Sequence, residues 1–227
     1  MKLRRLVAVI VVLLGILVVA FIKAPAEGEQ NSAPPVSQQA VSDSPAIDTL
    51  NKLAVKGRAP KTGYTRSQFG DGWASKNGCD TRNIILNRDL SDVKLNDKCQ
   101  VVSGVLNDPY TGKMIQFTRG PDTSTAVEID HVVALSDAWQ TGAQQLTASE
   151  RKTLANDPLE LLAVDGPANV QKSDGDAATW LPSNKSFRCE YVARQIAVKA
   201  KYTLWVTPAE KDAMVRILNS CPGQSLP

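Results

Sequence analysis

This chain of 227 residues has little histidine: it contains a single one, His131. No second imidazole is therefore left to activate a serine or cysteine nucleophile elsewhere. The chain also lacks a Cys-x-x-Cys pair, which argues against a zinc knot. These absences direct attention to His131, because imidazole is the side chain whose unperturbed pKa lies closest to neutrality.

The chain also lacks a real excess of positive charge. Its formal net charge is +3, but four of its 26 basic residues, Lys2, Arg4, Arg5 and Lys23, lie in the first 26 positions. Without them, 22 basic residues face 23 acidic ones, a net charge of −1. A polyanion would thus need a local basic patch or a metal ion, because the field of the whole molecule would not attract it.

The N-terminus has the layout of an export signal. A short basic flank precedes an uninterrupted apolar run over residues 6–22, and Ala24-Pro25-Ala26 offers a small-x-small cleavage site. The run is longer than a usual signal core and shorter than the roughly 20 residues that span a bilayer comfortably. Residues 1–26 are predicted to be either a cleaved signal peptide or an uncleaved signal anchor.

Both alternatives place the rest of the chain outside the cytoplasm. The protein is then secreted, or held to the cytoplasmic membrane through its N-terminal segment alone. Residues 27–45 are rich in Ser, Gln, Pro and Ala, which predicts a flexible linker. Residues 46–227 are long enough for one folded domain.

Four cysteines follow the predicted signal: Cys79, Cys99, Cys189 and Cys221. An even number of cysteines in an exported chain predicts two disulfides. Three pairings are open, and the shortest loops favour Cys79 with Cys99 and Cys189 with Cys221.

The order of predicted elements is mixed, without βαβ regularity, which indicates an α+β fold. Helices are expected over residues 47–53, 84–90, 147–155, 191–204 and 207–219, the third and the last opened by capping boxes. Strands are expected over residues 100–106 and 114–118, which form a hairpin, and over 127–131 and 159–164. Another helix is expected immediately after the turn at residues 165–167.

Polar residues stand at the junctions of the last two strands and that helix. Asp130 and His131 end the first strand, Asn156 precedes the second, and Asn169 lies at the start of the helix. This arrangement resembles the ββα-metal fold of HNH (His-Me finger) nucleases. The resemblance implies an HNH core embedded in a disulfide-stabilised domain, with a β-hairpin and C-terminal helices.

More narrowly, the chain resembles exported actinobacterial proteins with a DUF1524/GmrSD-type C-terminal HNH domain, over residues 60–222. The strings that carry this resemblance are Cys79-Asp80-Thr81-Arg82, Asp108-Pro109-Tyr110-Thr111-Gly112, Asp130-His131-Val132-Val133-Ala134-Leu135 and Asn169-x-x-Lys172-Ser173-Asp174.

The resemblance implies roles by position. His131 is expected to be the general base that activates a water, with Asp130 and Asn169 as metal ligands and Asn156 as the residue that shapes the intervening loop. Lys172 is expected to hold a flanking phosphate. Because no closing histidine is present, the oxygen ligands suit one divalent cation, Mg²⁺ or Mn²⁺, better than zinc.

Two more carboxylates are candidates for supporting roles. Glu128 projects to the same side of its strand as Asp130 by the two-residue period, and Asp174 follows Lys172 closely. Structural interpretations stay open throughout: the Asp130–His131 pair can be a simple hydrogen-bonded pair, and Asn156 and Asn169 can be cap or turn residues. The tryptophans Trp139, Trp180 and Trp205 are expected in the core.

The sequence thus predicts an exported, metal-dependent HNH-type endonuclease that hydrolyses phosphodiester bonds of DNA or RNA. No obligate protein partner is evident. The basic residues expected near the site are Lys172, Arg119, Lys185, Arg188 and Arg194. So few contacts predict little sequence specificity. The alternative is a non-catalytic envelope or cell-surface binding protein that retains the HNH-like scaffold.

Overall fold

The structure is a computed structural model that describes residues 45–227. The predicted signal or anchor over residues 1–26 lies outside this range, as does the predicted linker over residues 27–45 except for Pro45. Within residues 45–227, every helix is too short or too polar to cross a bilayer.

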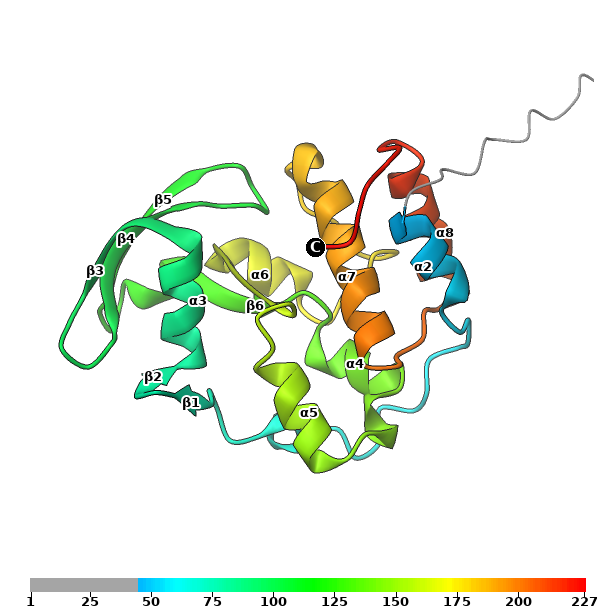
Figure 1. The fold of residues 1–227 in the computed structure, drawn as a ribbon, viewed down its shortest axis with the longest axis horizontal. Coiled ribbons are helices and arrows are strands. Elements are labelled where there is room, and N and C mark those ends of the chain that lie inside the picture. The colour runs from blue at the N-terminus through cyan, green and yellow to red at the C-terminus, as the bar shows by residue number, and fades with distance from the viewer. Residues whose placement is uncertain (1–44) are drawn as a thin grey trace, which may run out of the picture. The chain divides into compact units, whose positions relative to one another are not determined.

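The described residues form the mixed α+β fold expected from the sequence (Figure 1). The other elements lie on two sides of strand β6 (Val127–His131) and helix α6 (Gly166–Lys172). On one side, α2 (Pro45–Lys52), α7 (Arg188–Lys201) and α8 (Pro208–Leu218) pack together. On the other side, α3 (Thr81–Asp89) packs against a small sheet. Helices α4 (Leu135–Gln140) and α5 (Ala148–Ala155) lie between strands β6 and β7 (Leu161–Asp165) in the sequence.

The strands form small antiparallel sheets. The largest has the order β3 (Leu90–Leu95), β4 (Val101–Asn107) and β5 (Met114–Thr118), and contains the predicted hairpin as β4 and β5. Strand β3 was not predicted from the sequence. It carries register shifts and a positive φ of 51° at Asp92, which break the two-residue alternation that marks a strand. The smallest sheet pairs β1 (Ser75–Lys76) with β2 (Cys79–Asp80).

The central hairpin pairs β6 (Val127–His131) with β7 (Leu161–Asp165), close to the strand bounds predicted from the sequence. Alternate residues serve two cores. Ile129 and Ala163 belong to the core shared with α3 and the three-stranded sheet. Leu162 and Val164 belong to the core of the helical side. The hairpin is therefore held from both faces, as the two-residue period of a strand requires.

Local sequence signals account for where several helices begin. Capping boxes at Thr147 with Glu150 and at Thr207 with Glu210 open α5 and α8, which confirms both predictions. Helix α7 begins at Arg188, three residues before its predicted start. Among the tryptophans expected in the core, Trp139 and Trp205 are buried. Trp180 is partly buried and packs against the core of the helical side, to which Trp139 belongs.

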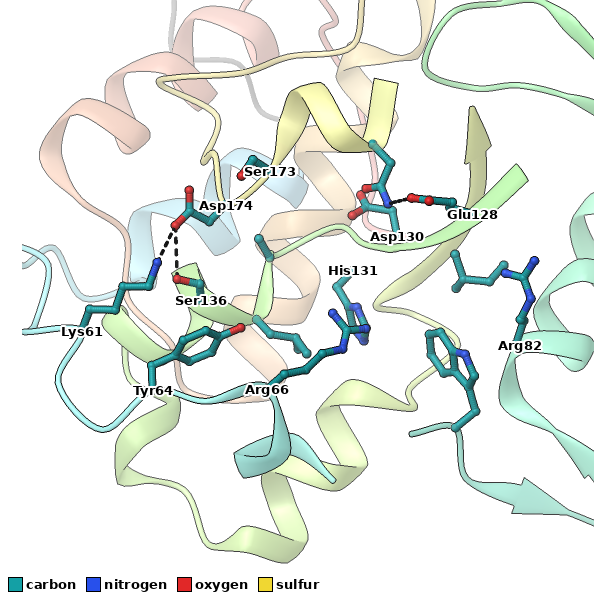
Figure 2. Close-up of a pocket in the computed structure, with 15 residues that line it drawn as sticks. Lys61, Tyr64, Arg66, Arg82, Glu128, Asp130, His131, Ser136, Ser173 and Asp174 are labelled. Carbon is teal, nitrogen blue, oxygen red and sulfur yellow. Dashed lines mark hydrogen bonds and ion pairs between the residues drawn. The ribbon is translucent and has the colours of Figure 1, made fainter. Parts of the chain in front are cut away.

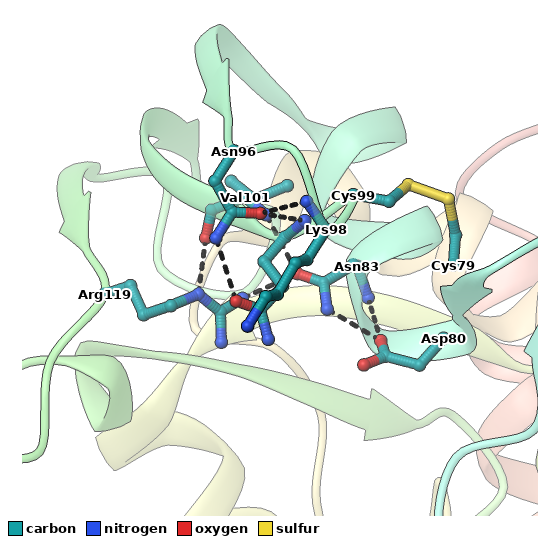
Figure 3. Close-up of a disulfide and its surroundings, with 9 residues drawn as sticks. Cys79, Asp80, Asn83, Asn96, Lys98, Cys99, Val101 and Arg119 are labelled. Atoms are coloured by element: carbon teal, nitrogen blue, oxygen red, sulfur yellow. Dashed lines mark hydrogen bonds between the residues drawn. A yellow bond between two sulfur atoms is a disulfide. The ribbon is translucent and has the colours of Figure 1, made fainter.

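Both predicted disulfides are present: Cys79–Cys99 and Cys189–Cys221. The first joins the segment before α3 to the segment before β4, beside a hydrogen-bonded cluster (Figure 3). Asn83 of α3 accepts from the backbone N–H of Val101 at 2.9 Å and donates to Asp80, the cap of the helix, at 2.8 Å. The start of α3 is thus fixed to β4 by a covalent bond and by hydrogen bonds.

Loss of either disulfide is expected to lower the free energy of unfolding by about 3 kcal/mol, because each bond closes a loop in the unfolded chain. The sequence separations are 20 and 32 residues. Urea unfolding of Cys79→Ser/Cys99→Ser and Cys189→Ser/Cys221→Ser variants measures this. Unchanged unfolding midpoints would contradict the expectation, and alkylation of the unreduced wild-type protein should detect no free thiol.

Candidate active site

Helix α6 (Gly166–Lys172) follows β7 without an intervening loop. The Asp165 carboxylate caps it by accepting from the Ala168 N–H at 2.8 Å, and Pro167 stands in its first turn. A Cβ at Gly166 would lie 2.0 Å from the carbonyl oxygen of Thr125, so only glycine fits this close approach. The turn predicted at residues 165–167 is therefore the first turn of a helix whose position is fixed by the chain before it.

A cavity of about 590 Å³ opens beside β6 and α6 (Figure 2). Five of the predicted site residues line it together: Glu128, Asp130 and His131 from β6, Asn169 from α6, and Asp174 from the segment after α6. Glu128 and Asp130 share one side of β6, as the two-residue period predicts.

His131 is held at the base of this cavity with one defined tautomer. Its Nε2 lies 3.0 Å from the carbonyl oxygen of Ala155, which can only accept, so Nε2 carries the proton and Nδ1 keeps the lone pair. Within residues 45–227, Nδ1 has no hydrogen-bond partner. The ring stacks on Trp73, with centroids 5.7 Å apart and planes inclined by 8°. Burial lowers the pKa of His131 to about 3, so the imidazole is neutral at neutral pH.

Asp130 belongs to a buried polar cluster. Its Oδ1 accepts from the ammonium of Lys172 at 2.9 Å, and its Oδ2 accepts a short hydrogen bond from the hydroxyl of Tyr110. The ammonium of Lys172 also donates to the carbonyl oxygen of His131 at 2.8 Å. Burial raises the pKa of Asp130, and the Lys172 ammonium and Tyr110 hydroxyl oppose this shift.

The position of Lys172 differs from the phosphate contact expected from the sequence. Its side chain is 0% exposed and is paired with Asp130. A charge of this kind is buried only because a counter-charge accompanies it. In the described structure, Lys172 therefore supports Asp130 and His131 from behind the cavity and does not reach solvent.

Glu128 and Asn169 form the other polar pair of the cavity. The side-chain amide of Asn169 donates to Glu128 at 2.7 Å, which turns the Asn169 carbonyl oxygen away from that bond. Among residues 45–227, no group of three or more His, Cys, Asp or Glu side chains is placed to hold a metal ion. The oxygen donors that line the cavity are the carboxylates of Glu128, Asp130 and Asp174 and the amide oxygen of Asn169, which are hard ligands of the kind that Mg²⁺ and Mn²⁺ prefer.

Asn156 and Asp174 lie further from the cavity floor. Asn156 caps the end of α5 and accepts from the backbone N–H of Ala74 at 2.8 Å, so it fixes the segment that carries Trp73. It does not line the large cavity. Asp174 lies on the rim, where its carboxylate accepts from Lys61 at 3.0 Å and from Ser136 at 3.3 Å (Figure 2).

Sequence reasoning missed Tyr110, which it interpreted as part of a turn. That turn exists, because Asp108 accepts from the Thr111 N–H at 2.7 Å and from the Asp165 N–H at 2.9 Å. The second bond pins the turn to the end of β7 and places Tyr110 fully buried against Asp130. An aromatic residue inside an otherwise polar turn was the available signal.

The basic residues of the cavity were also missed. The predicted Arg119, Lys185, Arg188 and Arg194 do not line it. Arg119, for example, donates to the carbonyl oxygen of Val101 at 2.7 Å, far along the sheet. The basic residues that line the cavity are Lys61, Arg66 and Arg82. They lie 49 to 70 positions before His131, and sequence spacing could not show that they come together with it.

Residues 80–217 match the family described as GmrSD restriction endonucleases, C-terminal domain. The chain belongs to this family. The match covers Asp130, His131, Asn169 and Lys172, whereas Arg66 and Trp73 precede it. The sequence-based assignment to a nuclease family is thus confirmed at this level.

A relative from the fungus Arthroderma benhamiae is 39% identical over 183 residues, which cover 79% of this chain and 86% of that protein. It is described as an uncharacterized secreted protein. Because this relative is fungal, it does not support the narrower expectation that the chain is of an actinobacterial type. No solved structure matches the chain.

Proposed function

We propose that this protein is an exported, metal-dependent HNH-type endonuclease that hydrolyses phosphodiester bonds of DNA or RNA. The observation that carries the proposal is the setting of His131. Its tautomer is fixed by Ala155, and it lines a cavity that Asp130 and Asn169 also line. The pairing of β6 with β7, and the start of α6 directly after β7, support the strand, strand and helix of the proposed HNH core. Export is supported by the two disulfides and by the secreted relative.

His131 would act as the general base. A neutral imidazole with an unprotonated Nδ1 can accept a proton from a water that attacks phosphorus, while Nε2–H stays on the Ala155 carbonyl. Trp73 covers one ring face and the Ala155 bond fixes the ring plane, so the base needs no reorientation before proton transfer. Holding the base in a fixed orientation would itself contribute to the rate of hydrolysis.

Asp130 and Asn169 would hold one Mg²⁺ or Mn²⁺. When bound, this cation would neutralise charge on the phosphoryl oxygens and on the leaving oxygen. Tyr110 and Lys172 hold the Asp130 carboxylate in a fixed orientation, and Glu128 does the same for the Asn169 amide. In this proposal, Tyr110, Lys172 and Glu128 are positioning residues for the two metal ligands.

Cleavage is expected to require an added divalent cation. The chain without its first 26 residues, incubated with supercoiled plasmid DNA, should nick and linearise it in Mg²⁺ or Mn²⁺ and leave it intact in EDTA, because the donor set consists of hard oxygen atoms. The readout is the gel pattern over time, with His131→Ala protein as the contamination control. Undiminished cutting in EDTA would overturn the metal-dependent mechanism.

One observation favours the alternative, a non-catalytic binding protein on the HNH-like scaffold. Both carboxylate oxygens of Asp130 already have protein partners, Lys172 and Tyr110, which compete with a metal ion. The two functions separate in the same assay. A non-catalytic envelope or cell-surface binding protein would cleave neither DNA nor RNA in any divalent cation.

A further inference from the structure

Three basic side chains line the cavity, and two of them are engaged by protein groups. The ammonium of Lys61 pairs with Asp174 at 3.0 Å. The guanidinium of Arg82 donates to the backbone carbonyl oxygens of Ser124 and Val127, at 3.4 and 3.2 Å. The guanidinium of Arg66, in contrast, makes no hydrogen bond or ion pair with any residue in the part of the chain that the structure describes.

The Arg66 side chain points toward His131 (Figure 2). It lines the large cavity and also a smaller one of about 180 Å³, and these two cavities share Trp73 and His131. Burial is the main cause that lowers the pKa of His131, and the charge of Arg66 lowers it further. An unpaired guanidinium therefore stands beside the proposed base.

The charges around Arg66 leave it unneutralised. Of the three carboxylates that line the cavity, Asp130 is paired with Lys172 and Asp174 with Lys61. Glu128 is bonded to the neutral Asn169 amide on the α6 side. The guanidinium is thus available to an anion that enters the cavity, and planar guanidinium groups bind phosphate oxygens in a bidentate manner.

The backbone that carries Arg66 is firmly held. Arg66 begins the short helix η1 (Arg66–Phe69), which contacts α5. Arg151 donates to the backbone carbonyl of Gln68 at 2.9 Å and to its side chain at 3.0 Å. Phe69 is 2% exposed and packs edge-on against Trp139. These contacts fix the backbone from which the exposed Arg66 side chain extends.

We propose that Arg66 is a phosphate-binding residue that grips a non-bridging oxygen of the substrate phosphate next to His131. This proposal rests on the proposed function for its role in the reaction, but not for the binding of phosphate itself. Arg66 would add positive charge where the phosphoryl group gains negative charge in the transition state. It lies before residues 80–217, so the family match does not assign it.

The first test uses the single histidine as a reporter. In metal-free protein at one fixed pH, added inorganic phosphate should shift the ring resonances of His131 in the NMR spectrum, and those resonances belong to no other residue. The shift should disappear in Arg66→Ala and weaken in Arg66→Lys. Arg216→Ala is the matched control, because Arg216 is an exposed arginine on α8.

Equal phosphate-induced shifts in wild type and Arg66→Ala would overturn the proposal, as would no shift in the wild-type protein. The second test is kinetic: Arg66→Ala should lower kcat/KM for DNA cleavage by about 10²- to 10³-fold, with partial recovery in Arg66→Lys. Unchanged kcat/KM would remove the role in the reaction. Loss of phosphate binding in Arg66→Ala, with a wild-type protein that cuts no nucleic acid, would leave the phosphate site standing and refute the nuclease.

Discussion

Substitution of His131 by alanine should lower the rate of DNA cleavage by about 10²- to 10⁴-fold, the usual contribution of a general base. No other imidazole exists in the chain to take over. The loss should appear mainly in kcat, because His131 is only 6% exposed and offers little surface for binding a substrate. Initial rates over a range of DNA concentrations separate kcat from KM.

Folding has to be measured in the same variant. His131→Ala removes one hydrogen bond, to Ala155, and one ring contact, with Trp73. The lost hydrogen bond alone costs about 1 kcal/mol, so the variant should remain folded by circular dichroism. Trp73→Phe keeps an aromatic ring beside the imidazole and should retain most activity. A folded His131→Ala protein that cleaves DNA at the wild-type rate would refute the assignment of the base.

Substitution of Lys172 by alanine should reduce the free energy of unfolding by about 3 to 5 kcal/mol, because it leaves the Asp130 carboxylate buried without its counter-charge. This expected loss of stability replaces the phosphate contact that the sequence implied for Lys172. Chemical denaturation measures the change. Lys185→Ala is the matched control, since Lys185 is exposed and its loss should alter stability by less than about 0.5 kcal/mol.

A double substitution distinguishes the charge from the packing. Asp130→Asn/Lys172→Met removes both charges and keeps the volume of the side chains close to the original. Replacing a buried ion pair in this way is often neutral for stability, so the double variant should be more stable than Lys172→Ala. The same variant loses the proposed metal ligand and should not cleave DNA. Full stability in Lys172→Ala alone would show that the pair contributes nothing to the fold.

Features carried by neighbouring residues could be predicted from the sequence. Strand β6 has its predicted bounds, because alternation over five residues is a local property. The capping boxes of α5 and α8 were visible for the same reason. The common side of Glu128 and Asp130 followed from the strand period, and Asn169 joined them because α6 starts directly after β7. His131 has the opposite parity, so the period alone did not place it in the same cavity.

Features that depend on distant segments could not be predicted. The role of Tyr110 requires Asp108 to bind the backbone of Asp165, 57 positions later. From the sequence, Lys172 is expected to be a solvent-exposed charge. It is buried only because α6 places it against Asp130. Helix α4 was missed because its six residues follow the apolar residues 132–134, where no polar cap marks a new helix.

The junction between β7 and α6 also constrains how the length of this chain can change. His131 and Leu161 are paired residues, so residues 132–160 leave and re-enter the hairpin at neighbouring points, and an insertion there need not disturb the strands. One residue inserted after Asp165 would instead turn α6 by about 100° and carry Asn169 and Lys172 away from β6. Insertions and deletions in related chains should therefore accumulate between the strands and be absent from the junction that follows them.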